Sequence, residues 1–189
     1  MAGKALEATR LRVSEACCAI YIAHKTTDLT VAEIAREAEV AERSFYRYFP
    51  IKAESVGPVF DWTTRTFNEA VAAAPRDVPL QSVLRDGYRA MLGGDVADRT
   101  RNLFPLVFAD AEMWSVFLRK VHDGERSLAP ILASRLGIVT DSVFARTVAA
   151  AVASATRISL EEMITTGEDP EQIFLESLEA FSTGDLIER

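Results

Sequence analysis

The sequence has few of the residues on which most catalytic, metal-binding and secreted proteins depend. Its 189 residues contain two cysteines and two histidines. The cysteines, Cys17 and Cys18, are neighbours, so they provide neither a disulfide framework nor the spaced pairs of a zinc site. The histidines, His24 and His122, lie outside any His-x-x-x-His, Gly-x-Ser-x-Gly or glycine-rich phosphate motif. We therefore expect no catalytic residue, no metal and no cofactor.

Long apolar runs are also missing. The chain is 49% hydrophobic, yet no apolar run approaches the roughly 18 residues that span a bilayer. The residues that follow Met1 lack the apolar stretch and the cleavage site of a signal peptide. We expect a cytoplasmic protein that has no membrane partner and buries a sizeable core.

Acidic residues outnumber basic ones, but unevenly along the chain. The net charge is −7, with 21 basic and 28 acidic residues. Residues 1–60 hold eight of each sign, so residues 61–189 carry the whole acidic excess. This balance argues against indiscriminate binding of nucleic acid. It allows a local contact in which a few cations of the N-terminal part meet phosphate.

No segment keeps the period-two alternation of a half-buried strand, whereas helical periodicity recurs throughout. The expected fold is all-α, with about nine helices. A first helix covers about 4–24, and two short helices follow over about 31–38 and 42–48. We expect this N-terminal part, residues 1–52, to be a DNA-binding domain and residues 53–189 to form a larger domain for ligand binding and dimerisation.

Prolines and glycines divide the larger part. We expect the helix after Pro50 to start late or to bend near Pro58, because proline lacks an N–H donor. The next helix should end at Gly93-Gly94. Region 98–136 should be helical but interrupted at Pro105 and Pro130.

Two short helices joined by a tight turn favour a helix-turn-helix. Thr30-Val31-Ala32-Glu33 has the Thr-x-x-Glu pattern of a capping box, which starts the first of them. In the second, a turn of about 100° per residue places Phe45, Phe49 and more marginally Tyr48 on an inner side, toward Ile34 and Ala35.

The opposite side of the second short helix has the chemistry of a major-groove reader. Arg43 and Arg47 point away from the inner aromatics, with Ser44 and Tyr46 on the flanks. Arginine matches guanine N7 and O6, and hydroxyls suit phosphates or base edges. Lys52, at the start of the next helix, could hold a phosphate.

Residues 30–52 resemble the TetR family of bacterial transcriptional regulators. The residues that carry the resemblance are Thr30-Val31, Ile34-Ala35, Ala38, Val40 and Phe45-Tyr46-Arg47-Tyr48-Phe49-Pro50 with Lys52. The resemblance implies phosphate contacts for Thr30, Tyr46 and Lys52. It also implies a homodimer that binds a palindromic operator in double-stranded DNA and is released by a small-molecule effector.

Further DNA contacts follow from the same resemblance. Arg43, Ser44 and Arg47 are candidates for base contact or its near neighbourhood, and Tyr48 stands near the DNA backbone. The full set of expected DNA-binding residues is Thr30, Arg43, Ser44, Tyr46, Arg47, Tyr48 and Lys52.

Two residues depart from the family pattern at the turn. Glu39 replaces a usual glycine, which costs about 1 kcal/mol if its φ is positive. Ala41 replaces a usual serine, so a side-chain cap worth about 1 kcal/mol is lost.

Two expected sites lie in the larger domain. Small residues on the helix over 141–166 and apolar residues on the last helix suggest a four-helix dimer interface; an ordinary intramolecular helix pair is the alternative. The expected interface residues are Ala149, Ala153, Phe174 and Leu178. Bulky apolar residues suggest a ligand pocket, although most of them could simply be core. They are Trp62, Phe67, Tyr88, Met91, Phe104, Phe108, Met113, Trp114 and Phe117, with His122 at the rim.

The effector is expected to be largely apolar, because region 98–136 looks loosely similar to family members that bind acyl-chain-like ligands. Its anionic headgroup could meet the cations Arg101, Arg119, Lys120 and His122. The sequence gives less support to two other functions. An enzyme lacks support from any catalytic motif. A helical interaction protein with a degenerate helix-turn-helix is the main alternative, because the turn is altered at Glu39 and Ala41.

Overall fold

The computed structural model describes residues 2–182, and within that range the chain is all-α. It contains nine α-helices and one short 3-10 helix, with no strand among the described residues. The all-α prediction and the number of helices are confirmed. The chain divides into two compact units, one of Met1–Trp62 with Asp98–Lys120 and the other of Thr63–Ala97 with Val121–Arg189. We call these unit 1 and unit 2; the functional division at residue 52 stays a prediction.

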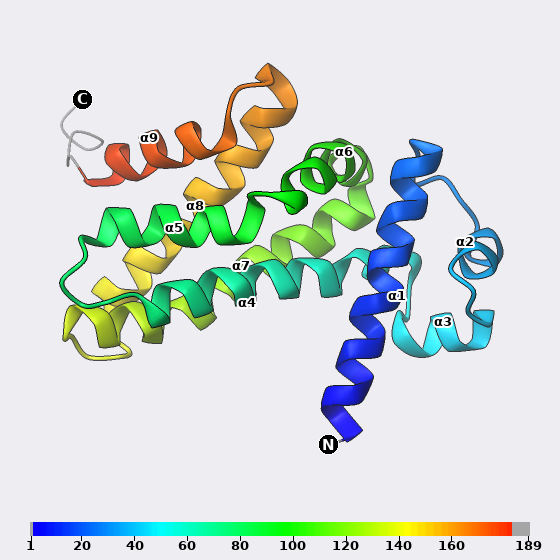
Figure 1. Cartoon of the computed structure of the whole chain (residues 1–189), viewed down its shortest axis with the longest axis horizontal. Helices are drawn as coiled ribbons and strands as arrows, with labels where there is room; N and C mark the ends of the chain where they lie inside the picture. The colour runs from blue at the N-terminus through cyan, green and yellow to red at the C-terminus, as the bar shows by residue number, and fades with distance from the viewer. Residues whose placement is uncertain (1, 183–189) are drawn as a thin grey trace. The chain divides into compact units, whose positions relative to one another are not determined.

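Four elements form the N-terminal part of unit 1. They are α1 (Ala2–His24), α2 (Val31–Glu37), α3 (Glu42–Tyr48) and the 3-10 helix η1 (Lys52–Val56). The helix α1 packs on α2 and η1, and α2 packs on α3 (Figure 1). Tyr21, Ile34, Phe45 and Phe49 are fully buried and fill the space behind these elements. Their burial stabilises α2, α3 and η1, each of which would be too short to persist alone.

The helix after Pro50 starts late, as expected. Residues Lys52–Val56 form η1, and α4 (Gly57–Ala73) follows directly. Pro58 lies in the first turn of α4, where a missing N–H costs nothing because first-turn amides have no intrahelical partner.

The prolines of region 98–136 do not interrupt the helices, which corrects the prediction. Both Pro105 and Pro130 lie inside helices, in α6 (Asp95–Ala109) and α7 (Ala111–Leu136) respectively. The break falls at Asp110 instead. Its carboxylate accepts hydrogen bonds from the amides of Glu112 (3.1 Å) and Met113 (3.0 Å), which starts α7.

Three helices, together with parts of α4 and α7, build the core of unit 2. They are α5 (Leu80–Leu92), α8 (Val143–Thr166) and α9 (Pro170–Ser182). The α8–α9 pair packs most extensively, and α5 packs on α9 (Figure 1). The Tyr88 ring of α5 stacks on Phe174 of α9, with centroids 4.3 Å apart, and its hydroxyl shares a 2.8 Å hydrogen bond with Ser159 of α8. One side chain thus joins all three helices.

Helix α8 is long and apolar enough, by length and composition, to cross a membrane. This differs from the expectation that no apolar run would reach that length. Many alanines raise its mean hydropathy to 1.2, although Arg146 and Arg157 interrupt it. Its buried residues, among them Ala149, Val152 and Ala155, belong to the core of unit 2, and only 33% of the apolar window is buried within the chain.

Candidate nucleic-acid interface

The helix α2 starts with the expected capping box. The Thr30 hydroxyl accepts from the Glu33 amide (3.3 Å), and the Thr30 amide donates to Glu33 Oε2 (2.8 Å). The Thr30 hydroxyl also donates to Glu33 Oε2 (2.6 Å). These bonds lower the pKa of Glu33, because they favour its charged form. The Thr30 proton that could meet a phosphate is therefore held by Glu33 in this structure.

The turn between α2 and α3 has the two departures expected from the sequence. Glu39 has a φ of 55°, the left-handed region in which a side chain is strained. Ala41 is the N-cap of α3 and supplies no side-chain hydrogen bond. The turn is closed instead by backbone bonds, of which the Val40 amide to the Ala35 carbonyl measures 2.9 Å.

Aromatic rings fix α3 against the other helices of unit 1. Phe45 and Phe49 are fully buried, and their rings meet edge to face at 5.2 Å. The half-buried ring of Tyr48 contacts Phe49 in the same manner at 6.2 Å. This confirms the inner side expected from the helical projection.

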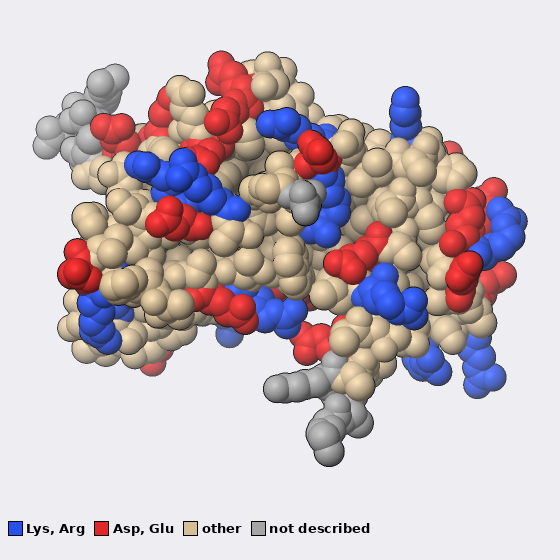
Figure 2. Space-filling view, viewed as in Figure 1, with Lys and Arg blue, Asp and Glu red and all other residues tan. Residues whose placement is uncertain are grey.

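The outer side of α3 carries the basic and hydroxyl groups expected to meet DNA. Arg43 and Arg47 are exposed, Ser44 is half-buried, and Tyr46 is 51% exposed. Figure 2 shows basic side chains projecting over α3, with acidic and basic side chains mixed over α2. Glu42, at the start of α3, is an exposed acid on the same helix.

Arg47 and Tyr48 are paired. Arg47 Nη2 donates a 3.0 Å hydrogen bond to the Tyr48 hydroxyl, and the guanidinium carbon lies 5.0 Å from the centre of the Tyr48 ring. The sequence places both residues on one short helix but does not indicate that they interact.

Lys52 does not project freely from the head, the N-terminal part of unit 1 formed by α1, α2, α3 and η1. Its ammonium donates to the carbonyl oxygens of Thr27 (2.8 Å) and Leu29 (3.3 Å) in the loop before α2. An ammonium has three donors, so one stays available to a phosphate. Lys52 thus holds the loop that leads to Thr30, a role that the sequence did not reveal.

Two buried hydrogen bonds join η1 to α1. Ser14 of α1 donates to the Ser55 carbonyl (2.5 Å), and the hydroxyls of Tyr21 and Ser55 share a 3.0 Å hydrogen bond. Burial raises the pKa of Cys17 and Cys18 on the same helix to about 12, which keeps both thiols protonated. The cysteines are therefore packing residues of α1.

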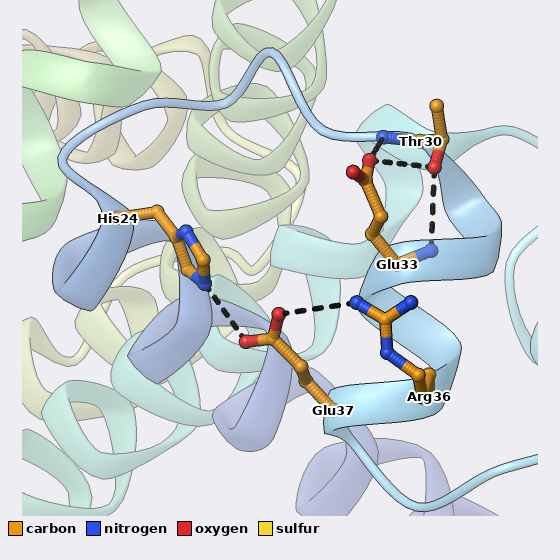
Figure 3. A network of polar contacts seen from close by, with 5 residues as sticks. All are labelled: His24, Thr30, Glu33, Arg36 and Glu37. Carbon is orange, nitrogen blue, oxygen red and sulfur yellow. Dashed lines mark hydrogen bonds and ion pairs between the residues drawn. The ribbon is translucent and has the colours of Figure 1, made fainter.

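A second polar network links the end of α1 to α2 (Figure 3). His24 Nε2 lies 2.8 Å from Glu37 Oε2, and Arg36 lies 3.8 Å from the other oxygen of the same carboxylate. His24 is thus a structural contact between two helices of the head, and the sequence offered no sign of its partner.

Six of the ten expected pocket residues lie in unit 1, where rings pack on one another. Phe104 and Phe117 meet edge to face at 4.9 Å, and Phe117 lies 4.9 Å from Trp114. Phe108 contacts Trp114 and is 41% exposed. Met113 is fully buried, and Arg99 lies over the half-buried Trp62 ring at 5.5 Å.

The other four expected pocket residues lie in unit 2. Phe67, Tyr88 and Met91 belong to its core cluster. His122 is exposed and lines a cleft of about 610 Å³. The cleft residues are His122, Glu125, Arg126, Ala129, Pro130, Thr140, Asp141 and Arg146.

The cations expected to meet an anionic headgroup are differently placed. Arg119 pairs with Glu54, and Lys120 pairs with Asp61 at 2.8 Å, all within unit 1. Arg101 is exposed on α6. Of the expected cations, His122 is the one that lines the cleft of unit 2.

The four expected interface residues differ in exposure. Ala149 and Phe174 are fully buried within the chain, whereas Ala153 and Leu178 are half-buried. Full burial leaves Ala149 and Phe174 no surface with which to contact a second chain.

Comparison with known proteins agrees with this geometry. Residues 21–54 match the family model described as bacterial regulatory proteins, tetR family. The sequence has no significant match among curated proteins. The fold is similar to that of a protein assigned to the TetR-family transcriptional regulators, from Mesorhizobium loti MAFF303099, whose crystal structure was determined at 1.54 Å. The TM-score is 0.55 at 18% identity, over 93% of this chain and 96% of that one. The resemblance to the TetR family is thus confirmed: residues 21–54 carry its N-terminal region, and the fold agrees with it.

Proposed function

We propose that this chain, a TetR-family regulator by its residues 21–54 and its fold, acts in the cytoplasm as a homodimeric repressor. In this proposal it binds a palindromic operator and leaves it when a small molecule binds unit 2. It has no catalytic role in this proposal. The observation that carries it is α3, a short helix whose inner rings are buried and whose outer side presents two arginines.

The shape and chemistry of α3 suit the major groove. The groove admits an α-helix, and guanidinium groups match the N7 and O6 acceptors of guanine. Buried Phe45 and Phe49 hold the helix rigidly, so Arg43 and Arg47 would meet the base edges from a fixed backbone. Tyr46 and the free donor of Lys52 are proposed to contact phosphates.

The apolar surface of α8 supports a homodimer. Two thirds of the most apolar stretch of α8 is not buried within one chain. Removing such an apolar surface from water is favourable and would stabilise a complex that covers it. The side of α8 away from the core offers Ala150, Ala151 and Ser154, each half-buried, and small residues allow two helices to approach closely. A second copy would bury this face around a two-fold axis, with Ala153 and Leu178 at its edge.

The cleft of unit 2 is the proposed effector site. Its guanidinium groups, Arg126 and Arg146, have no salt-bridge or hydrogen-bond partner among the described residues. They suit a carboxylate or phosphate headgroup. Ala129 and Pro130 give the cleft an apolar portion, in keeping with an acyl-chain-like effector.

The DNA proposal is tested by fluorescence anisotropy on fragments that flank the protein's own gene. The wild type should bind one palindromic fragment tightly. The double variant Arg43→Ala, Tyr46→Ala should bind it about 5- to 150-fold more weakly, since one bidentate base contact alone is worth about 1–3 kcal/mol. A wild type that binds no palindrome would remove the repressor proposal. It would favour the alternative of a helical interaction protein, to which the strained Glu39 and uncapped Ala41 point.

The effector proposal is tested by a thermal-shift screen of fatty acids and acyl thioesters. A ligand of the cleft should raise the melting temperature of the wild type but not of the double variant Arg126→Gln, Arg146→Gln. A matched control is Arg101→Gln, an exposed arginine of α6 outside the cleft. Equal shifts in all three proteins would place the ligand elsewhere.

A further inference from the structure

Arg47, on the outer side of α3, pairs with the neighbouring Tyr48, and the geometry of the pair is specific. Nη2 of Arg47 donates to the Tyr48 hydroxyl over 3.0 Å. The guanidinium carbon lies 5.0 Å from the ring centre, within the range of a cation–π contact. A hydrogen bond and a cation–π contact thus restrict the long, exposed side chain of Arg47.

The hydrogen bond leaves most of the guanidinium available. Arginine has five N–H donors arranged in a planar fork, and the Tyr48 hydroxyl uses one of them. The remaining donors are sufficient for a bidentate contact with guanine N7 and O6. The pairing therefore fixes the plane of the fork without using up its donors.

Tyr48 can fix that plane because it is itself held. Its half-buried ring packs edge to face on Phe49 at 6.2 Å, and Phe49 is fully buried against Phe45. A path of ring contacts thus runs from the core of unit 1 to the guanidinium of Arg47. Tyr46, on the other flank of α3, is 51% exposed and orients no cation among the described residues.

We propose that Tyr48 is a positioning residue for base recognition: it holds the Arg47 guanidinium in the plane required to read a guanine. This rests on the proposed function, in which α3 enters the major groove. It departs from the expectation that Tyr48 simply lies against the DNA backbone. Orienting an arginine before binding reduces the entropy lost on binding, so the effect should appear as sequence discrimination.

The test measures discrimination with Tyr48→Phe, which keeps the ring and removes the hydroxyl. Anisotropy titrations compare the operator with variants in which each base pair of a half-site is replaced, and with unrelated DNA. Arg47→Ala should abolish the preference for guanine at one position. Tyr48→Phe should reduce the preference at that same position about two- to tenfold and leave the affinity for unrelated DNA unchanged. In the Arg47→Ala background, Tyr48→Phe should have no further effect.

Tyr46→Phe is the matched control, because it removes a hydroxyl from the same helix without touching the pair. It should weaken binding to all sequences alike. If Tyr48→Phe also weakens all DNA equally, the Tyr48 hydroxyl contacts phosphate and the proposal is wrong. Additive effects of Arg47→Ala and Tyr48→Phe, or unchanged discrimination in Tyr48→Phe, overturn it too. A wild type that binds no DNA would contradict the proposed function itself. A wild type that binds its operator while Tyr48→Phe keeps full discrimination would contradict only the role of Tyr48.

Discussion

Two polar side chains of the N-terminal region are already hydrogen-bonded within the protein. Thr30 is held by Glu33, and Lys52 by the carbonyls of Thr27 and Leu29. Both residues were expected from the sequence as phosphate contacts. The pairing of Thr30 with Glu33 follows from the capping-box pattern of the sequence. The carbonyl partners of Lys52 could not be read from it, because Lys52 lies 25 residues from Thr27 along the chain and meets it only in the folded protein.

Replacing Lys52 separates its two roles. Lys52→Ala should lower the free energy of unfolding by about 1 kcal/mol through the lost bonds to the loop. If its free donor meets a phosphate, the same change should weaken binding to all DNA sequences and flatten the salt dependence by about one unit. Urea denaturation and titrations at several salt concentrations measure the two effects. A loss confined to one operator sequence would contradict the phosphate contact.

The two cysteines should be inert in the folded protein. Burial raises their pKa to about 12, and the thiolate is the reactive form. In the folded protein, the fraction of each cysteine that is thiolate therefore stays low until the pH approaches 12. At pH 8 an aromatic disulfide reagent should label neither thiol in the native protein and both after unfolding in guanidinium. Fast labelling of the native protein would mean that α1 opens readily.

The helices α2 and α3 have seven residues each, so the capping of their ends decides how firmly they are held. The helix α2 has a complete capping box, whereas α3 begins at Ala41 without a side-chain cap. Glu39, two residues before Ala41, has a positive φ. The helix that carries the DNA-facing arginines is thus the one whose start is least supported by its own sequence, and the buried rings of Phe45 and Phe49 compensate.

Restoring a cap should stabilise α3. Ala41→Ser supplies a side-chain acceptor for an otherwise unpaired amide and should raise the free energy of unfolding by about 1 kcal/mol. Ala19→Ser, at an exposed position inside α1, is the control and should be neutral or slightly destabilising. Equal effects of the two changes in urea denaturation would show that the start of α3 needs no cap.

Removing the strain at the turn is an independent change. Glu39→Gly relieves a left-handed conformation that costs about 1–2 kcal/mol, but it adds about 0.5–1 kcal/mol of backbone entropy to the unfolded chain. The expected net gain is about 0.5 kcal/mol, with no loss of operator affinity. A clear loss of affinity would instead assign Glu39 a part in DNA recognition.

Across the whole molecule, charge and apolar surface are distributed differently along the chain. The excess of acid lies after residue 60, so phosphate repels most of the surface and attraction is limited to a few groups of the head. The apolar helix α8 is the other distinctive surface, since only a third of its apolar window is buried in one chain.

If the protein is a homodimer, its thermal stability should depend on the protein concentration. The melting temperature should rise with protein concentration, because the folded state gains free energy from association. Ala153→Arg should place a charge at the edge of the α8 face, shift the mass measured by light scattering to that of a monomer and remove the concentration dependence. Arg101→Glu, a charge change on α6, should alter neither. A wild type that stays monomeric, or that needs detergent to stay in solution, would contradict the homodimer.

Local patterns in the sequence determined the helices, the capping box, the late start of α4 and the inner and outer sides of α3. These features depend on neighbours within a few residues, so periodicity and capping chemistry suffice to predict them. The tertiary structure decided the features that depend on distant partners. It moved the helix break from the prolines to Asp110, buried Ala149 and Phe174 inside one chain, and placed the cations Arg119 and Lys120 in ion pairs. Composition fixes how many apolar and charged groups must find partners, but only the packed chain decides which partners they find.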